Sequence, residues 1–517
     1  MLISKQQTVK IGTVVLLLTV TGKIFSFLRE LVFSAKFGTS VYSDAYFASN
    51  IIPGLLYTPL IGSMLVFFIP LYSKLKTEGD KGETDRFSSN LLNIYVLFSG
   101  VVAIVIYLFA RILIKVVAPG FSGDSLEYAT TLLRISCLSF PVTMATWVYI
   151  NISNANQKHL IPQLLSLFNS IIAIIAMIIF SDTFGIFIVP ISGLFAWLIQ
   201  MLLQRSAIKK IFSYRIIFDF KDPLVKEVFL LAIPVFIATG IEQINLSINN
   251  MICSMFSQGS ISSLNYAQKV QSLINGTFTN AIIVVMYPIF SQLFAKHKEA
   301  ELYIKLKQCC RILFLVLLPI SIISILGSSD IIKIIYYRGV FTINDVMAVS
   351  KVFIFYSLGI LFLALKELYT RIYYIFGDSK TPAIINGLCI LVNVVLSFIF
   401  IRFIGIAGLA LATSISHLIT YIFEKKYIEK KFKTIKPESN KKVIVQILSS
   451  NIALVLVWFI LQLILSPLSS IIRFILSSVI GTITYIFVLS ISKNDECLAL
   501  INLIRKRFIR DQNQLIK

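Results

Sequence analysis

Apolar segments of about 20 residues recur from one end of this 517-residue chain to the other, and they restrict its fold more than any other feature. A segment of that length and composition suits an α-helix that crosses the hydrocarbon core of a bilayer. Hydrophobic residues make up 57% of the chain and charged residues only 14%, which excludes an ordinary soluble protein. We therefore predict an all-α polytopic membrane protein.

About fourteen segments carry this signal, with ends defined to within about 2–4 residues. The first segment is long and runs directly into Arg29-Glu30, so we expect no cleavable signal peptide. The predicted helices lie near residues 9–36, 45–75, 88–117, 126–154, 160–181, 184–207, 225–256, 262–295, 305–327, 345–376, 381–402, 405–428, 443–465 and 470–492.

The loops between these segments carry charge in an alternating pattern. The net charge is +22, but the basic residues fall mainly in every second loop, such as Lys76–Arg86, whereas Pro119–Glu127 has no Lys or Arg. This is the positive-inside bias of a membrane protein rather than a nucleic-acid-binding face. We expect both termini to be cytoplasmic. One loop departs from the pattern: Ser328–Asp345 holds Lys333 and Arg338, and we interpret it as an interfacial turn on the outer surface.

The chain also repeats itself at an offset of about 220 residues, which for example aligns Gly185 with Gly405. Six helices intervene, an even number, so the two halves have the same orientation and are related by an axis along the membrane normal. Two such lobes around a central cavity form a transporter architecture. We predict an N-lobe over residues 1–215, a C-lobe over 216–435, and two further helices with a cytoplasmic tail over 436–517.

Several ionisable residues fall inside the first two apolar segments. Lys23, Ser26 and Arg29 are spaced three residues apart, so they form one polar stripe along a helix. Glu30 directly follows this stripe, and Asp44 lies at the start of the second segment. A charge at bilayer depth costs several kcal/mol unless it faces protein or water, so such residues are candidates for substrate binding. Basic residues near helix ends also extend to the headgroups, and this alternative is strongest for Arg29.

The second lobe has its own polar positions. Glu242, Asn245 and Asn249 fall at i, i+3 and i+7, on one face of a helix. A carboxylate with amides at membrane depth can bind Na⁺ or a proton, and the three are ion-coupling candidates. They can equally form a hydrogen-bonded packing seam between helices, which the sequence favours somewhat. Lys269 adds a cation near the predicted cavity mouth, where an interfacial lysine that extends to the headgroups is the alternative.

Nothing in the sequence indicates enzymatic chemistry. There are three histidines, and no Walker A sequence, GxSxG or HExxH, so neither ATP hydrolysis nor covalent catalysis is expected. The six cysteines have no metal or disulfide spacing, and we interpret them as small core residues. We predict a transporter with no catalytic residues, no metal and no cofactor, driven by Na⁺ or H⁺ coupling or by the membrane potential.

Four stretches resemble one known family. They are GKIFSFLRE at 22–30, SDAYFASNIIPGLL at 43–56, APGF at 118–121 and RIYYIFGDSKTP at 371–382. They are similar to motifs of the lipid II flippase family (MurJ, also called MviN) of the MOP exporter superfamily. The resemblance runs in order from about residue 10 to about residue 430, and APGF with DSKTP is fairly specific to this branch.

The resemblance implies which residues bind the substrate. The family's central-cavity cations fall on Lys23 and Arg29, and its cavity carboxylate falls on Asp44. Two positions depart from the family's pattern: Tyr57-Thr58 stands where a basic residue is expected, and Gln268-Lys269 replaces an Asp-Arg pair. The cavity keeps a cationic character but loses some charge, and the Tyr57 ring can instead stack on a sugar face.

The function implied is that of a flippase for a polyprenyl-diphosphate-linked cell-wall precursor, with lipid II as the first candidate. It would act by alternating access in the bacterial cytoplasmic membrane, for peptidoglycan synthesis. The expected partners are the lipid-linked glycan, membrane lipids and the cell-wall synthesis machinery; we expect a monomer that binds no nucleic acid. Three alternatives stay open: a flippase for a capsule or O-antigen oligosaccharide, a cation-coupled multidrug exporter of the same superfamily, and a membrane glycosyltransferase or polymerase.

Overall fold

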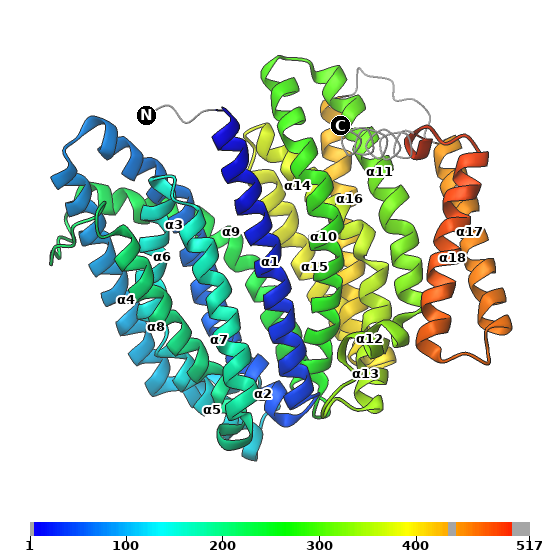
Figure 1. The fold of residues 1–517 in the computed structure, drawn as a ribbon, viewed down its shortest axis with the longest axis horizontal. Helices are drawn as coiled ribbons and strands as arrows, with labels where there is room; N and C mark the ends of the chain where they lie inside the picture. Colours follow the sequence, from blue (N-terminus) through cyan, green and yellow to red (C-terminus); the bar gives the residue numbers. More distant parts are fainter. Residues whose placement is uncertain (1–4, 433–440, 499–517) are drawn as a thin grey trace, which may run out of the picture. The chain divides into compact units, whose positions relative to one another are not determined.

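The computed structural model describes residues 5–432 and 441–498, and the regular structure of these residues is entirely helical (Figure 1). Contacts group the chain into two compact units. Unit 1 comprises Met1–Ser262 and Tyr336–Asp345, and unit 2 comprises Ser263–Ile335 and Val346–Lys517. The predicted lobes rest on an internal repeat instead of on contacts, so their boundaries at 215 and 435 stay a prediction.

Unit 1 is built from the first nine α-helices and one short 3₁₀ helix. Within it α1 packs on α7, α3 on α9, and α4 on α5 and α6. The helices are α1 (Lys5–Phe37), α2 (Val41–Ser49), α3 (Ile51–Glu78), α4 (Lys81–Val117), α5 (Gly123–Cys137), α6 (Phe140–Ala155), α7 (Leu160–Phe184), η1 (Gly185–Phe187), α8 (Ile188–Ile208) and α9 (Pro223–Cys253).

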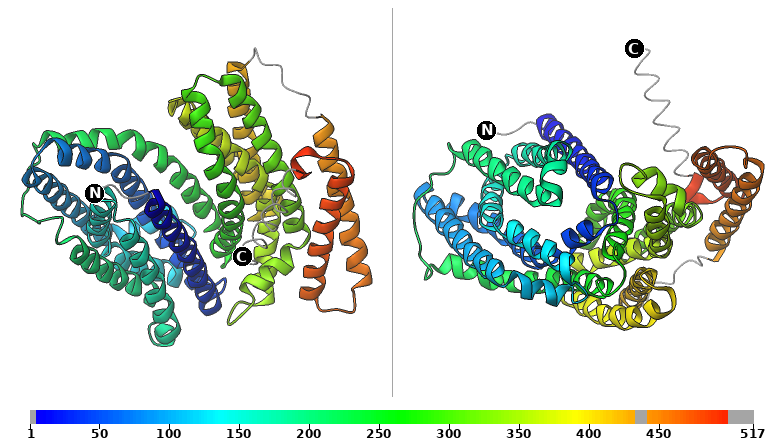
Figure 2. Two further views of the ribbon diagram at one scale, coloured as in Figure 1. Left: turned by 45° about the horizontal axis from the view of Figure 1, so that its top comes forward. Right: turned by 90° about the horizontal axis from the view of Figure 1, so that it is seen from below.

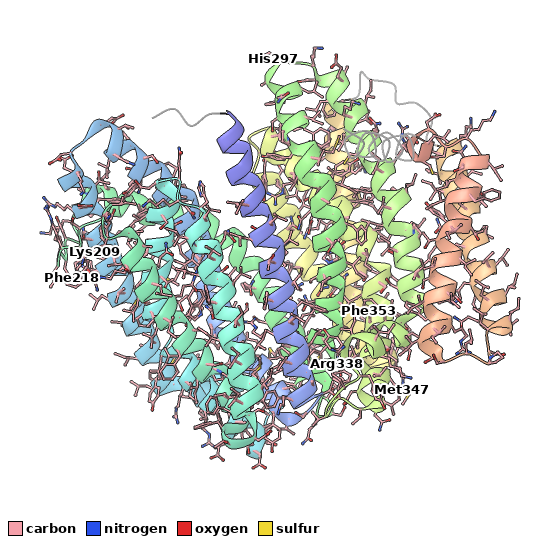
Figure 3. All side chains as sticks on the ribbon, in the orientation of Figure 1. Lys209, Phe218, His297, Arg338, Met347 and Phe353 are labelled. Carbon is pink, nitrogen blue, oxygen red and sulfur yellow. The ribbon has the colours of Figure 1, made fainter. Side chains whose placement is uncertain are left out.

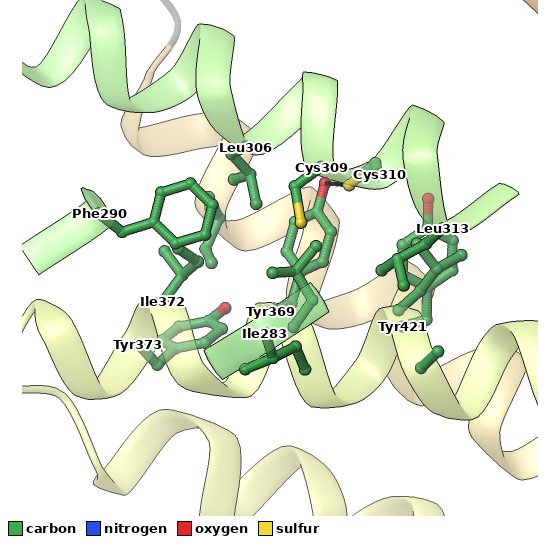
Figure 4. Close-up of a cluster of buried hydrophobic side chains, with 14 of the residues drawn as sticks. Ile283, Phe290, Leu306, Cys309, Cys310, Leu313, Tyr369, Ile372, Tyr373 and Tyr421 are labelled. Atoms are coloured by element: carbon green, nitrogen blue, oxygen red, sulfur yellow. Dashed lines mark hydrogen bonds between the residues drawn. The ribbon is translucent and has the colours of Figure 1, made fainter. Parts of the chain in front are cut away.

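The remaining helices lie wholly or mostly in unit 2. Its core joins α10, α11, α14 and α16 through side chains such as Phe290, Leu313, Tyr369 and Tyr421 (Figure 4). These helices are α10 (Ser260–Ala295), α11 (Glu299–Leu326), α12 (Ser328–Tyr336), α13 (Ile343–Leu358), α14 (Ile360–Ile375), α15 (Lys380–Ile404), α16 (Ala407–Lys431), α17 (Lys441–Ile464) and α18 (Ser470–Ile491).

The two last helices form a hairpin within unit 2, and Figure 2 shows α17 and α18 running side by side. The hairpin is fastened to α11, because the Tyr485 hydroxyl donates a hydrogen bond to the Leu315 carbonyl over 2.9 Å and Leu454 packs in the same cluster. All six cysteines of the chain are buried free thiols, which confirms their interpretation as core residues.

Each predicted apolar segment coincides with a helix or with a pair of consecutive helices. In the described part of the chain nine helices are long and apolar enough to cross a membrane, or up to eleven if each of two bent pairs is one span. The predicted class, an all-α polytopic membrane protein, is therefore confirmed, whereas the number of about fourteen spans is not.

Three of the predicted helices are interrupted. The segment 45–75 is divided between α2 and α3, while α5 and α6 meet at 40° and α13 and α14 at 45°. The bend between α13 and α14 lies at Gly359, where an added Cβ would be 2.5 Å from Ser414 Oγ. The Ser414 hydroxyl donates to the Phe355 carbonyl over 2.7 Å, so it satisfies an acceptor that the end of α13 leaves without a helical partner.

The repeat recurs in the helix bounds. Helices α7 and α15 are each 25 residues long, α6 and α14 are each 16 residues long, and each pair is displaced by about 220 residues. Both long helices end at a glycine with a left-handed backbone, Gly185 (φ 56°) and Gly405 (φ 61°). Each glycine N–H donates back to the fourth preceding carbonyl, a helix-ending geometry that favours glycine. The internal repeat is thus confirmed at the level of helices and turns.

Candidate functional site

The predicted polar stripe lies on α1, in unit 1. Lys23 and Ser26 are exposed and Arg29 is half-buried. The helix turns a different side toward α7, where Gly22 faces Leu167: a Cβ added to that glycine would lie 3.9 Å from Leu167 Cδ2. The close α1–α7 packing therefore leaves the Lys23 ammonium accessible, as a substrate-binding cation must be.

Arg29 and Glu30 form a small polar group with residues of two other segments. Both side chains lie in the neighbourhood of Tyr46 on α2, whose ring centroid is 4.9 Å from that of Phe33. Glu30 is also in the neighbourhood of Tyr336, at the end of α12. A guanidinium can bind two phosphate oxygens at once, and a neighbouring carboxylate and phenols can hold it in one orientation.

Asp44 lies in a different environment from the stripe. Its side chain is only 4% exposed, and its two carboxylate oxygens accept the backbone N–H groups of Gly259, over 2.6 Å, and Ser262, over 2.7 Å. Gly259 directly precedes α10 and Ser262 lies in its first turn, where a carboxylate also complements the helix dipole. Asp44 therefore anchors this helix start to α2, and substrate binding by Asp44 stays a prediction.

The turn between α1 and α2 is also held by the segment Tyr336–Asp345. The N–H of Val340 donates to the Ala35 carbonyl over 2.9 Å, and the Thr39 hydroxyl bonds the Asp345 carboxylate. Gly339 has φ 60°, and an added Cβ would lie 2.1 Å from the Ala35 oxygen, so only glycine fits there.

Together with the Asp44 bonds, these contacts fasten the α1–α2 turn and α2 to two distant segments of unit 1, and we call them the clasp. The sequence predicts only an interfacial turn for Ser328–Asp345, and this docking was not predicted. The single local signal was the glycine at 339, which the sequence alone did not connect with the α1–α2 turn.

Tyr57 lies on α3 and is half-buried. Its ring centroid is 4.0 Å from that of Phe140, the first residue of α6, with the planes tilted by 37°. One side of the Tyr57 ring is therefore covered by protein. Stacking on a sugar stays a prediction, and it would have to use the opposite side of the ring.

The predicted ion-coupling residues lie on α9. Asn245 is half-buried and Asn249 is 3% exposed, and within the described residues neither amide oxygen has a hydrogen-bond partner. The side chain of Glu242 lies outside the described part of the structure. Both ion binding and a packing role for these residues stay predictions.

The other predicted cation, Lys269, is half-buried on α10 in unit 2. Among the described residues there is no cluster of three or more His, Cys, Asp or Glu side chains that could hold a metal ion. The chemistry available on α1 is therefore charge pairing and hydrogen bonding.

Comparison with known proteins places these features in one family. The family model described as "Lipid II flippase MurJ" matches residues 33–480. The chain belongs to the lipid II flippase MurJ family. A relative from Synechocystis, named a probable lipid II flippase MurJ, is 26% identical over 429 residues, which cover 79% of each chain.

Solved structures agree with this assignment. A lipid II flippase MurJ in an inward closed conformation matches with a TM-score of 0.80 and 26% identity, covering 93% of this chain and 99% of the other. An inward-facing multidrug resistance MATE family transporter of the MOP superfamily matches with a TM-score of 0.68 at 12% identity, covering 80% of this chain and 95% of the other. The second likeness concerns the fold alone.

Proposed function

We propose that this protein is a flippase that moves lipid II across the membrane by alternating access, for peptidoglycan synthesis. The observation that carries the proposal is the match of the MurJ family model over residues 33–480. The chain is accordingly a transporter rather than an enzyme, and its substrate is a lipid-linked glycan.

The cations on α1 support a diphosphate-bearing substrate. The headgroup of a polyprenyl-diphosphate lipid is doubly charged and cannot cross hydrocarbon unaided. An exposed Lys23 and the Arg29 group can replace its hydration with charge-assisted hydrogen bonds. The same cations disfavour a multidrug exporter of cationic compounds, with which the chain shares the fold at 12% identity.

The setting of this activity belongs to the proposal. We place the protein in the bacterial cytoplasmic membrane as a monomer with both termini in the cytoplasm, and it delivers its substrate to the cell-wall synthesis machinery. A capsule or O-antigen lipid carries the same diphosphate, so discrimination would rest with residues that contact the sugar, for which Tyr57 is the candidate.

For coupling, we propose that α9 binds Na⁺ or a proton through Glu242, Asn245 and Asn249. The two buried amide oxygens without partners among the described residues support this role. Glu242→Gln should then remove the dependence of transport on Na⁺ or pH, measured in cells or vesicles with imposed ion gradients. Unchanged ion dependence in the variant would leave the α9 residues as packing groups.

A rescue experiment tests the proposal. Expression of the protein in cells depleted of their own lipid II flippase should restore growth, whereas Lys23→Ala and Arg29→Ala should fail at normal membrane levels. Lys36→Gln is the matched control: this cation lies on the same helix but forms an exposed pair with Asp182 over 3.2 Å, which contributes little. Failure of the wild-type chain to rescue, with rescue of a capsule-flippase mutant instead, would move the substrate to that oligosaccharide.

A further inference from the structure

The connection between α8 and α9 runs in an extended conformation along the start of α4. Side chains on α4 hydrogen-bond the main chain of every second residue of this connection. The Arg215 N–H donates to Ser89 Oγ (3.0 Å), Asn93 Nδ2 donates to the Ile217 carbonyl (2.9 Å), and Asn90 both donates to the Asp219 carbonyl (2.9 Å) and accepts from the Asp219 N–H (2.8 Å).

This attachment turns the alternate side chains outward, because successive residues of an extended chain point to opposite sides. Tyr214 is 41% exposed, Ile216 79%, Phe218 53% and Phe220 59%. Figure 3 shows Phe218 at the edge of unit 1. We call these four side chains the aromatic ridge. The Tyr214 hydroxyl donates a hydrogen bond back to Asn93 Oδ1 over 2.8 Å, and the other three side chains form an exposed apolar strip that lies outside any membrane helix.

The ridge lies where apolar spans begin. Helix α8 ends at Ile208 and α9 starts at Pro223, so the connection leaves one span and enters the next. Beyond the asparagines, α4 continues from Ile94 to Val117, about 24 residues or about 36 Å, enough to cross the hydrocarbon core. The ridge therefore lies at a membrane–water boundary, where aromatic side chains are enriched in membrane proteins.

A groove opens beside the ridge. It has a volume of about 470 Å³, its wall is almost wholly apolar, and Lys226 is its charged lining residue. The apolar lining includes Ile94 of α4, Phe220 of the ridge, and Phe229, Leu230 and Ile233 of α9. A groove of this kind suits a hydrocarbon chain with an anionic group at its mouth.

The surroundings of the groove are basic. Between Arg205 and Glu227 there are six basic residues against three acidic ones. Two of the acids are engaged: Asp219 pairs with Arg86 over 3.5 Å, and Asp222 accepts the Leu224 N–H at the start of α9. The six basic and three acidic residues leave this stretch with a net positive charge, which complements a phosphate.

We propose that the ridge and the groove form a binding site for an anionic phospholipid of the surrounding membrane. One acyl chain occupies the groove, the headgroup phosphate pairs with Lys226, and the ridge inserts at the level of the headgroups. Basic and apolar groups so arranged at a boundary fit a lipid surface better than a soluble partner. The site is separate from the stripe on α1, and it does not depend on the proposed transport activity.

Site-specific photo-crosslinking tests this assignment. The photoreactive residue p-benzoylphenylalanine is placed at Phe220 in full-length protein reconstituted in vesicles of phosphatidylcholine and phosphatidylglycerol, and lipid adducts are identified by mass spectrometry. We expect phosphatidylglycerol adducts several-fold above its share of the vesicle lipid, and loss of this enrichment with Lys226→Gln. The same residue placed at Phe403, 78% exposed on α15, should report the bulk lipid ratio.

Two controls make the outcome decisive. Lys298→Gln removes an exposed lysine at the start of another helix and should keep the enrichment, and an unchanged thermal unfolding midpoint should show that Lys226→Gln is folded. Adducts at Phe220 that follow the bulk ratio would overturn the headgroup assignment. Absence of lipid adducts at Phe220, with normal adducts at Phe403, would overturn the site altogether.

Discussion

At the scale of single residues, two charged side chains that the sequence places in apolar segments have different surroundings. Lys23 on α1 is exposed, whereas Asp44 on α2 is buried with both carboxylate oxygens bonded to backbone N–H groups. The first is available to a ligand, and the second is already occupied by protein. The partners of Asp44 lie more than two hundred residues away in the chain, so no local pattern could indicate them.

Substitution of Asp44 separates the anchoring role from substrate binding. In Asp44→Asn the amide nitrogen cannot accept the second N–H, so we expect a loss of about 1–3 kcal/mol in the free energy of unfolding and a lower unfolding midpoint in detergent. Asp182→Asn is the control, because that side chain is 84% exposed in its ion pair. A normal midpoint together with weakened lipid II binding would instead assign Asp44 to the substrate.

At the scale of helices, hydropathy located the elements but not their interruptions. Helices such as α7 and α15 follow from long apolar runs ended by glycine, and the repeat of about 220 residues survives in their bounds. The bend at Gly359 depends on Ser414 of another helix, and the docking of Tyr336–Asp345 depends on the α1–α2 turn. A window that averages hydropathy along the chain contains no information about such tertiary contacts.

In the candidate site, too, local sequence patterns were predicted and tertiary contacts were not. The stripe from Lys23 to Arg29 follows from helical spacing, and the structure places these residues on one accessible helix. The clasp was not predicted, and neither were the hydrogen bonds between the Asn90 side chain and the Asp219 main chain. Each of these contacts joins segments more than a hundred residues apart. Side chains that hydrogen-bond a distant main chain leave no periodic signal in the sequence.

Gly339 in the clasp offers a test with a matched control. Gly339→Ala combines an unfavourable left-handed backbone, about 1–2 kcal/mol, with a clash against the Ala35 oxygen. Gly377→Ala has the same backbone problem at φ 73° but open space around it. We expect faster amide hydrogen exchange in 336–345 for Gly339→Ala alone. Equal exchange in both variants would mean that the clasp does not hold this loop.

At the scale of the whole molecule, the alternating loop charge sets the predicted orientation. Cysteines introduced at Ser122 and Ser257, both exposed, should react with an impermeant thiol reagent in intact cells. Cysteines at Lys81 and Lys298 should react only after permeabilisation. The background is low because the six native cysteines are buried. The reverse labelling pattern would invert the orientation and with it the direction of transport.

Translocation by the purified protein tests the central claim most directly. Fluorescent lipid II is reconstituted with the protein in vesicles, and an impermeant reductant bleaches only the label in the outer leaflet. We predict that vesicles with the wild-type protein lose nearly all fluorescence, whereas vesicles with the Lys23→Ala and Arg29→Ala double variant lose only the outer-leaflet fraction. Wild-type vesicles that bleach no further than protein-free vesicles, under every Na⁺, pH and voltage gradient applied, would contradict the account.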